Sequence, residues 1–274
     1  MGSISTQAES AGRQAHQSEW LDHAARIGLV AYGVVHLVVA WLAVQLAMGE
    51  REGSADSKGA IQQLAEQPFG QGLVWAVGIG MFLLALWQAL EAFFGYRDEE
   101  GFTQVRKRVT AAGKAVVYVV IGVSALRAAT GSASSGKNGT DSTTAKVMDW
   151  PGGQAIVVAV GLFLIGIGGY LVHRAWTERF AKHINAEGRS GETGTAYLWF
   201  GKAGYTAKGV TFGIVGSLFL YAGLTHEPKK SGGLDQALHK VLQQPFGPFL
   251  LAAIAAGLGC YGLFCFARAR HFND

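Results

Sequence analysis

The sequence predicts an all-α integral membrane protein of six transmembrane helices, arranged as three tandem parallel hairpin repeats with pseudo-threefold symmetry. Half of the 274 residues are apolar, and only 15% are charged. Six apolar segments approach the length of about 20 residues that a helix needs to cross a bilayer. One unit of two such segments occurs three times along the chain. The predicted spans are 27–48, 73–94, 109–129, 155–173, 203–224 and 248–267.

The repeat is a hairpin of two apolar segments joined by a polar connector. The first connector ends in Gln67-Pro68-Phe69-Gly70, and the same tetrapeptide returns as Gln244-Pro245-Phe246-Gly247. A degraded middle copy reads Trp150-Pro151-Gly152-Gly153. Measured from the prolines, the second and third copies follow the first by 83 and 177 residues. The first spans of the three units align independently at shifts of 82 and 176 residues. Because the two alignments agree within one residue, we infer a true triplication.

This layout resembles the bacterial membrane protein family of domain of unknown function 1206. The resemblance rests on the pair of spans present three times and on the Pro-Phe-Gly motif before the second span of a pair. It extends from about Arg26 to the end of the chain. It implies an architecture and no known activity. The chain then divides into an N-terminal tail, 1–25, and three membrane hairpins at 26–95, 108–180 and 200–274.

The distribution of basic residues predicts the orientation in the membrane. Fifteen Lys and Arg residues lie on the side of the two termini, and eight lie on the other side. Basic residues are retained on the cytoplasmic side, so we expect both termini in the cytoplasm and the protein in the bacterial plasma (inner) membrane. The connectors on the other side contain short stretches with helical apolar spacing at 60–65, 145–148 and 234–241, which predict short amphipathic helices.

The composition also limits the partners and cofactors. The net charge of +4 comes from basic residues in the segments that flank the spans. This pattern does not favour a nucleic-acid partner, which requires basic residues clustered on a soluble face. The expected partner is the lipid bilayer, with anionic lipid headgroups or another membrane protein as more specific candidates. We predict no cofactor.

Lys114, Lys208 and Glu91 are the clearest polar signals inside the spans. A lysine at the centre of a membrane helix costs about 2.5 to 3.5 kcal/mol on insertion scales. One interpretation is that both lysines extend to the cytoplasmic headgroups. The other is that they face the interior near Glu91 and form a cytoplasmic-side anion or headgroup pocket.

Tyr32, His36, Tyr118 and Phe212 mark a predicted inner face of the first spans. Tyr32 and His36 are one turn apart, and Tyr118 and Phe212 occupy the repeat positions equivalent to His36. Small residues beside them allow close helix packing. We therefore expect the first span of each repeat inside the bundle and the second span outside. His36 lacks a matching histidine in the other repeats, which favours a core histidine over a metal or haem ligand.

The sequence favours a non-enzymatic membrane protein with a structural or interaction role, such as binding lipid or a membrane-protein partner. The alternative is a small channel or carrier with a path along the pseudo-threefold axis. An intramembrane enzyme is the least favoured class because the chain shows no Walker loop, no G-x-S-x-G elbow, no H-E-x-x-H and no C-x-x-C motif.

Overall fold

The structure is a computed structural model that describes residues 19–49, 54–67, 70–96, 100–131, 140–184, 187 and 190–271. Most of the predicted N-terminal tail and the predicted turn residues Pro68 and Phe69 lie outside this range. The described residues contain six helices that are long and apolar enough to cross a membrane. These are α2 (Glu19–Ala47), α4 (Gly70–Phe94), α5 (Gly101–Ala129), α7 (Gly153–Trp176), α8 (Gly191–Thr225) and α10 (Gly247–Arg270).

Several helices begin before the predicted spans. α2 begins at Glu19, inside the segment assigned to the tail, and α8 begins at Gly191 instead of near residue 203. Hydropathy marks only the part of a helix that lies in hydrocarbon, whereas the backbone can stay helical in the polar segment before it. The predicted spans therefore mark the apolar part of each helix, and the helices themselves extend beyond them.

Three short helices occupy the connectors, at the positions that the apolar spacing predicted. They are α3 (Ser57–Ala65), α6 (Thr140–Met148) and α9 (Leu234–Leu242). Asp56 caps α3, because its Oδ1 accepts hydrogen bonds from the backbone N–H groups of Lys58 (2.9 Å) and Gly59 (2.8 Å). Burial raises the pKa of this carboxyl group despite these two bonds. The neighbouring Ala55 N–H donates to Asp235 Oδ1 at 2.8 Å and so joins the connectors of repeats one and three.

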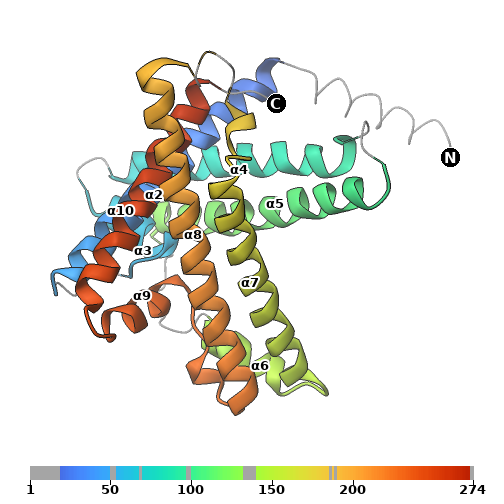
Figure 1. The fold of residues 1–274 in the computed structure, drawn as a ribbon, viewed down its shortest axis with the longest axis vertical. Helices are drawn as coiled ribbons and strands as arrows, with labels where there is room; N and C mark the ends of the chain where they lie inside the picture. Colours follow the sequence, from blue (N-terminus) through green and yellow to red (C-terminus); the bar gives the residue numbers. More distant parts are fainter. Residues whose placement is uncertain are drawn as a thin grey trace.

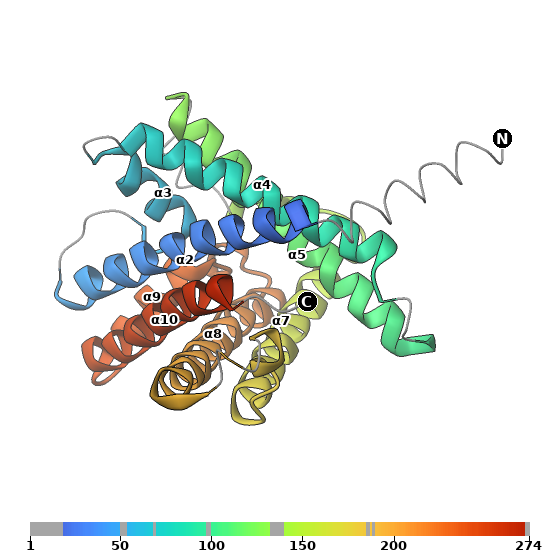
Figure 2. The same cartoon turned by 90° about the horizontal axis from the view of Figure 1, so that it is seen from above.

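The most extensive helix contacts join neighbouring repeats. α4 packs along α5, α7 along α8, and the C-terminal α10 along the N-terminal α2. The contacts of α2 with α4 and of α10 with α8 then complete an arc in the order α5, α4, α2, α10, α8, α7. Figure 2 shows α2, α10, α8 and α7 side by side in this order, and Figure 1 shows the pairs pointing in different directions. We call the side where α2 begins and α10 ends the terminus side, and the side of α3, α6 and α9 the connector side.

The first span is the more buried of its pair in repeats one and two, as expected, but not in repeat three. The apolar 18-residue stretch of α2 is 61% buried against 50% for α4, that of α5 28% against 17% for α7, and that of α8 33% against 50% for α10. The second spans also pack closely because small residues line both kinds of span. A Cβ atom at Gly33 of α2 would lie 3.0 Å from the Gly262 carbonyl of α10, and one at Gly168 of α7 would lie 2.6 Å from the Gly209 carbonyl of α8. Such pairs let backbones of both kinds of span approach closely.

The arc is open at its ends, because α5 and α7 do not pack along each other as α2 and α4 do. These two helices belong to the second repeat. The hairpin that the sequence repeat defines is thus closed in the first and third repeats and open in the second.

The turn motif forms the same hydrogen bond in each repeat. The N–H of Gly70 donates to the Gln67 carbonyl (2.7 Å), that of Gly153 to Trp150 (2.8 Å) and that of Gly247 to Gln244 (2.8 Å). A Cβ atom at any of the three glycines would collide with a backbone carbonyl of the preceding short helix. The motif therefore fixes a tight bend between the connector helix and the next span.

Candidate functional site

The three residues of the predicted pocket lie on three different helices. Lys114 is on α5, Lys208 on α8 and Glu91 near the end of α4. The Lys114 ammonium group interacts electrostatically with both Lys208 and Glu91, so the structure brings the three groups into one region. The Lys114 side chain is exposed at the protein surface, and Lys208 is half-buried.

Two arginines that the sequence interpretation did not single out belong to the same region. Lys114 also interacts electrostatically with Arg174 of α7 and Arg268 of α10. Both arginines, together with Glu91, also interact with Tyr96. We call Glu91, Lys114, Arg174, Lys208 and Arg268 the central charge cluster. It contains four cations and one carboxylate.

The repeat alignment explains why these groups meet. Arg174 and Arg268 follow Glu91 by 83 and 177 residues, which are the shifts of the turn motif. Lys208 follows Lys114 by 94 residues, the difference between the shifts of the first spans, and the equivalent residue of repeat one is Tyr32. Each repeat therefore directs two equivalent positions toward a common centre. The signal for the missed arginines was present in this alignment.

Aromatic rings and hydroxyl groups support the cations of the cluster. Lys208 Nζ donates a hydrogen bond to Tyr32 Oη at 3.0 Å and lies 3.9 Å from the centre of the Tyr261 ring. The guanidinium carbon of Arg174 lies 5.0 Å from the centre of the Tyr205 ring, and that of Arg268 lies 5.8 Å from the centre of the Trp87 ring. Cation–π contacts of this kind stabilise a partly desolvated cation without neutralising its charge.

The single carboxylate of the cluster has a neutral partner. Tyr96, just beyond the end of α4, donates a hydrogen bond to Glu91. Burial raises the pKa of Tyr96, and the hydrogen bond to Glu91 raises it further. Tyr96 thus stays protonated at neutral pH and remains a donor to the carboxylate.

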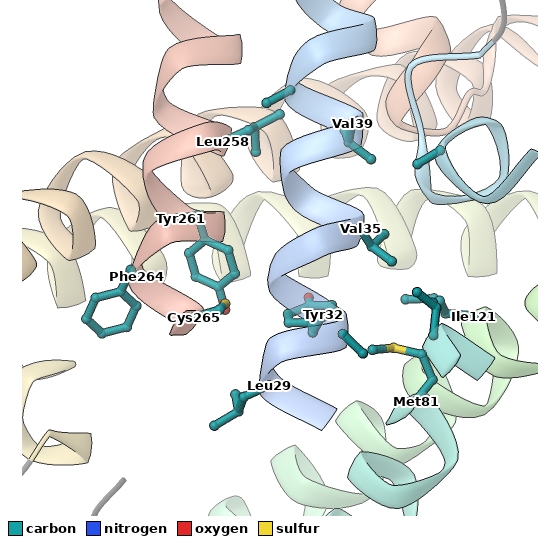
Figure 3. Packing of buried hydrophobic residues seen from close by; sticks show 14 of the residues in the cluster. Leu29, Tyr32, Val35, Val39, Met81, Ile121, Leu258, Tyr261, Phe264 and Cys265 are labelled. Atoms are coloured by element: carbon teal, nitrogen blue, oxygen red, sulfur yellow. The ribbon is translucent and has the colours of Figure 1, made fainter. Parts of the chain in front are cut away.

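The predicted inner face is only partly assembled. Tyr32 meets Tyr118 with ring centres 5.2 Å apart, and His36 lies 4.9 Å from Tyr261. Figure 3 shows Tyr32 of α2 between Tyr261 and Cys265 on one side and Met81 and Ile121 on the other. Phe212 is half-buried and makes no aromatic ring contact with other described residues.

His36 is held as a packed residue of α2. Its Nδ1 lies 2.9 Å from the Tyr32 carbonyl, which fixes Nδ1–H as the donor, and its ring lies 4.2 Å from that of Tyr32. Within the described residues, no three His, Cys, Asp or Glu side chains are grouped as a metal site would require. This arrangement suits the interpretation of His36 as a core histidine.

A second feature is an apolar groove of about 600 Å³ between α8 and α10. Trp176, Trp199 and Lys202 lie at one end of it, and Val241 and Leu250 at the other. Lys202 already has an anionic partner, because its Nζ lies 2.9 Å from Glu178 Oε1, and it also faces both tryptophan rings. The groove therefore offers apolar surface but no unpaired charge.

Comparison with known proteins identifies the repeat. A family model described as Domain of Unknown Function (DUF1206) matches residues 27–95, 109–178 and 203–271. The chain is also similar to the uncharacterized protein YxxB of Bacillus subtilis (strain 168), with 29% identity over 264 residues that cover 91% of this chain and 90% of the relative. No solved structure matches. The chain therefore belongs to the family of domain of unknown function 1206 and carries three copies of its repeat in tandem.

Proposed function

We propose that this protein is a non-enzymatic, multi-pass protein of the bacterial plasma membrane that binds the anionic headgroup of a phospholipid on the cytoplasmic side. The observation that carries the proposal is the central charge cluster, in which four cations face one carboxylate. Lys114 of α5 and Arg174 of α7 interact as like charges, which repel each other. A bound anion at these two cations relieves the repulsion.

The chemistry of the cluster favours a phosphate group. Arg174 and Arg268 carry planar guanidinium groups, which bind phosphate oxygens through two parallel hydrogen bonds. Lys114 and Lys208 contribute compact charges of the kind that also bind phosphate. The excess of basic residues favours a cytoplasmic location for the terminus side, and anionic lipids attract cationic protein segments there.

Two observations support a binding role over the channel or carrier alternative. The centre of the Tyr32 ring lies 5.2 Å from that of Tyr118 and 6.2 Å from that of Tyr261, so bulky rings crowd the region that an axial path would have to cross. Three of the four cations, Lys208, Arg174 and Arg268, also lie against aromatic rings on several helices, which suits a fixed binding site. An ion or solute flux in proteoliposomes that the cluster variants abolish would favour the alternative.

The test is native mass spectrometry of the purified protein with phosphatidylglycerol and, separately, phosphatidylcholine. The double variant Lys114→Gln, Arg174→Gln is expected to weaken phosphatidylglycerol binding by about tenfold or more, because each lost charge-assisted hydrogen bond contributes roughly 1.5 to 3 kcal/mol. Phosphatidylcholine binding should change little.

The matched control is Lys146→Gln with Lys240→Gln, which removes the same charge from exposed positions on the connector side. This control is expected to bind phosphatidylglycerol as the unmodified protein does. The variant Lys114→Arg keeps the positive charge at this position and is expected to retain phosphatidylglycerol binding. Equal loss in the two double variants, or no preference of the unmodified protein for phosphatidylglycerol, would overturn the proposal.

A further inference from the structure

The second repeat differs from the others at the contact between its two spans. In repeat one, a Cβ atom at Gly80 of α4 would lie 2.6 Å from the Cβ of Ala31, so these helices touch through small residues. In repeat three, Gly257 of α10 faces Ala207 of α8 in the same way. The equivalent of Gly80 and Gly257 in repeat two is Phe163. A phenylalanine at this position is too large for the close approach that glycine allows in the other two repeats.

A second contact position has changed in the same direction. Gly28 of α2 lies against Leu84 of α4, and Gly204 of α8 lies against Tyr261 of α10. The equivalent residue of α5 is Thr110, which is exposed. Two substitutions of glycine by larger residues therefore account for the open hairpin of repeat two.

The side chains that would close the hairpin remain uncovered. Phe163 is 68% exposed. Tyr170 of α7 is 49% exposed, whereas its repeat equivalents Trp87 and Phe264 are 8% and 1% exposed. Val117 of α5 is 50% exposed, compared with 2% for the equivalent Val35 of α2. The opening between α5 and α7 is thus lined by apolar side chains that are buried in the two closed repeats.

Charged groups lie at the terminus-side end of this opening. Lys114 is on α5, one turn before the level of Val117, and is exposed where its equivalent Tyr32 is buried. Arg174 is on α7, one turn after Tyr170. The two cations interact electrostatically with each other, and Lys114 also interacts with Glu91, Lys208 and Arg268. An apolar lining that ends at a cationic group matches the two parts of an anionic phospholipid.

We propose that one anionic phospholipid binds with its acyl chains in the opening between α5 and α7 and its phosphate at Lys114 and Arg174. The proposal rests on the proposed function and adds where the lipid enters and which repeat receives it. The lipid takes the place of the helix contact that repeats one and three make directly. A single bound lipid per chain follows, because the other two hairpins are closed.

The test uses phosphatidylglycerol that carries a photoreactive diazirine in one acyl chain, with the labelled peptides mapped by mass spectrometry. In the unmodified protein, the label is expected on α5 and α7 at the level of Val117, Phe163 and Tyr170. The variant Gly113→Phe places a ring in the opening, and nothing lies within 4 Å of a Cβ atom at this position, so the fold can accept it. It should lower labelling of these peptides at least tenfold.

The matched control is Gly169→Phe on α7. A Cβ atom there also has open space, but the equivalents Leu86 and Leu263 are 43% and 41% exposed in the closed repeats, so this position faces outward. Labelling in the Gly169→Phe variant should be unchanged. The double variant Thr110→Gly, Phe163→Gly restores the small residues of the other repeats and should close the opening, again with loss of labelling.

The outcomes separate the two proposals. Labelling confined to other helices, while Lys114→Gln with Arg174→Gln still weakens phosphatidylglycerol binding, would overturn this inference and leave the proposed function standing. Labelling of the α5 and α7 peptides that falls equally in the Gly113→Phe and Gly169→Phe variants would likewise overturn it. Loss of any preference for the anionic lipid in the unmodified protein would overturn the proposed function first.

Discussion

The three repeats are alike on the connector side of the bundle and differ on the terminus side. On the connector side, the turns at Gly70, Gly153 and Gly247 make the same backbone hydrogen bond with lengths of 2.7 to 2.8 Å. On the terminus side, equivalent positions carry Glu91 in one repeat and arginine in the other two. Equal geometry at one end indicates a structural role, whereas unequal charges around a common centre make three copies into one asymmetric site.

The same contrast appears between the two ways in which spans pair. The contacts between repeats are built from small residues in all three cases, as with Gly33 and Gly262 or Gly161 and Gly216. The contacts within repeats are closed in two cases and open in one. The protein thus keeps its assembly contacts alike and varies the positions that surround the central charge cluster.

The largest effect is expected from the turn on the connector side. In Gly247→Ala, the added Cβ would collide with the Leu242 carbonyl, so we expect a loss of roughly 3 kcal/mol in the free energy of unfolding. Thermal unfolding of the detergent-purified protein measures it. The control Gly72→Ala has open space around the new Cβ and should be neutral or stabilise by up to about 1 kcal/mol. A stable Gly247→Ala protein would show that the turn is not fixed by this close approach.

An intermediate effect, on binding and not on stability, is expected at Glu91. The variant Glu91→Arg gives repeat one the residue of the other two repeats and removes the only carboxylate of the central charge cluster. We expect phosphatidylglycerol to bind about tenfold more tightly, a gain of about 1.4 kcal/mol, because the net positive charge around the phosphate rises. Titration by native mass spectrometry measures it. Weaker binding would mean that Glu91 positions a cation that the anion requires.

The sequence predicted the features that depend on local patterns. The spans, the triplication and the connector helices follow from apolar length and spacing, which each segment carries in itself. Lys114, Lys208 and Glu91 could be found because a charge inside an apolar segment is costly. Arg174 and Arg268 were missed because, at the ends of their spans, they have the same appearance as ordinary boundary cations.

The sequence could not predict which faces of the helices meet. Small residues occur on both spans of a repeat, so the pattern alone could not assign one set to the interior, and in repeat three the second span is the more buried one. The opening between α5 and α7 depends on Phe163 and Thr110. Their effect is visible only when the structure shows that Gly80, Gly257, Gly28 and Gly204 are contact positions.

The smallest effect concerns a side-chain bond that two of the three inter-repeat pairs share. Gln71 Nε2 of α4 donates to the Ala129 carbonyl of α5, and Gln154 Nε2 of α7 donates to the Gly223 carbonyl of α8, both at 2.8 Å. The equivalent residue of α10 is Pro248, so the pair of α10 and α2 is held without this bond.

We expect Gln154→Ala to lower the free energy of unfolding by about 1 kcal/mol, the net value of one hydrogen bond. Gln71→Ala should lower the free energy of unfolding by the same amount, because its bond has the same length and its acceptor, Ala129, is the repeat equivalent of Gly223. Thermal unfolding of both variants checks the comparison. Phosphatidylglycerol binding should stay unchanged, since this bond lies on the connector side, and a change in lipid affinity would show that the two sides of the bundle are coupled.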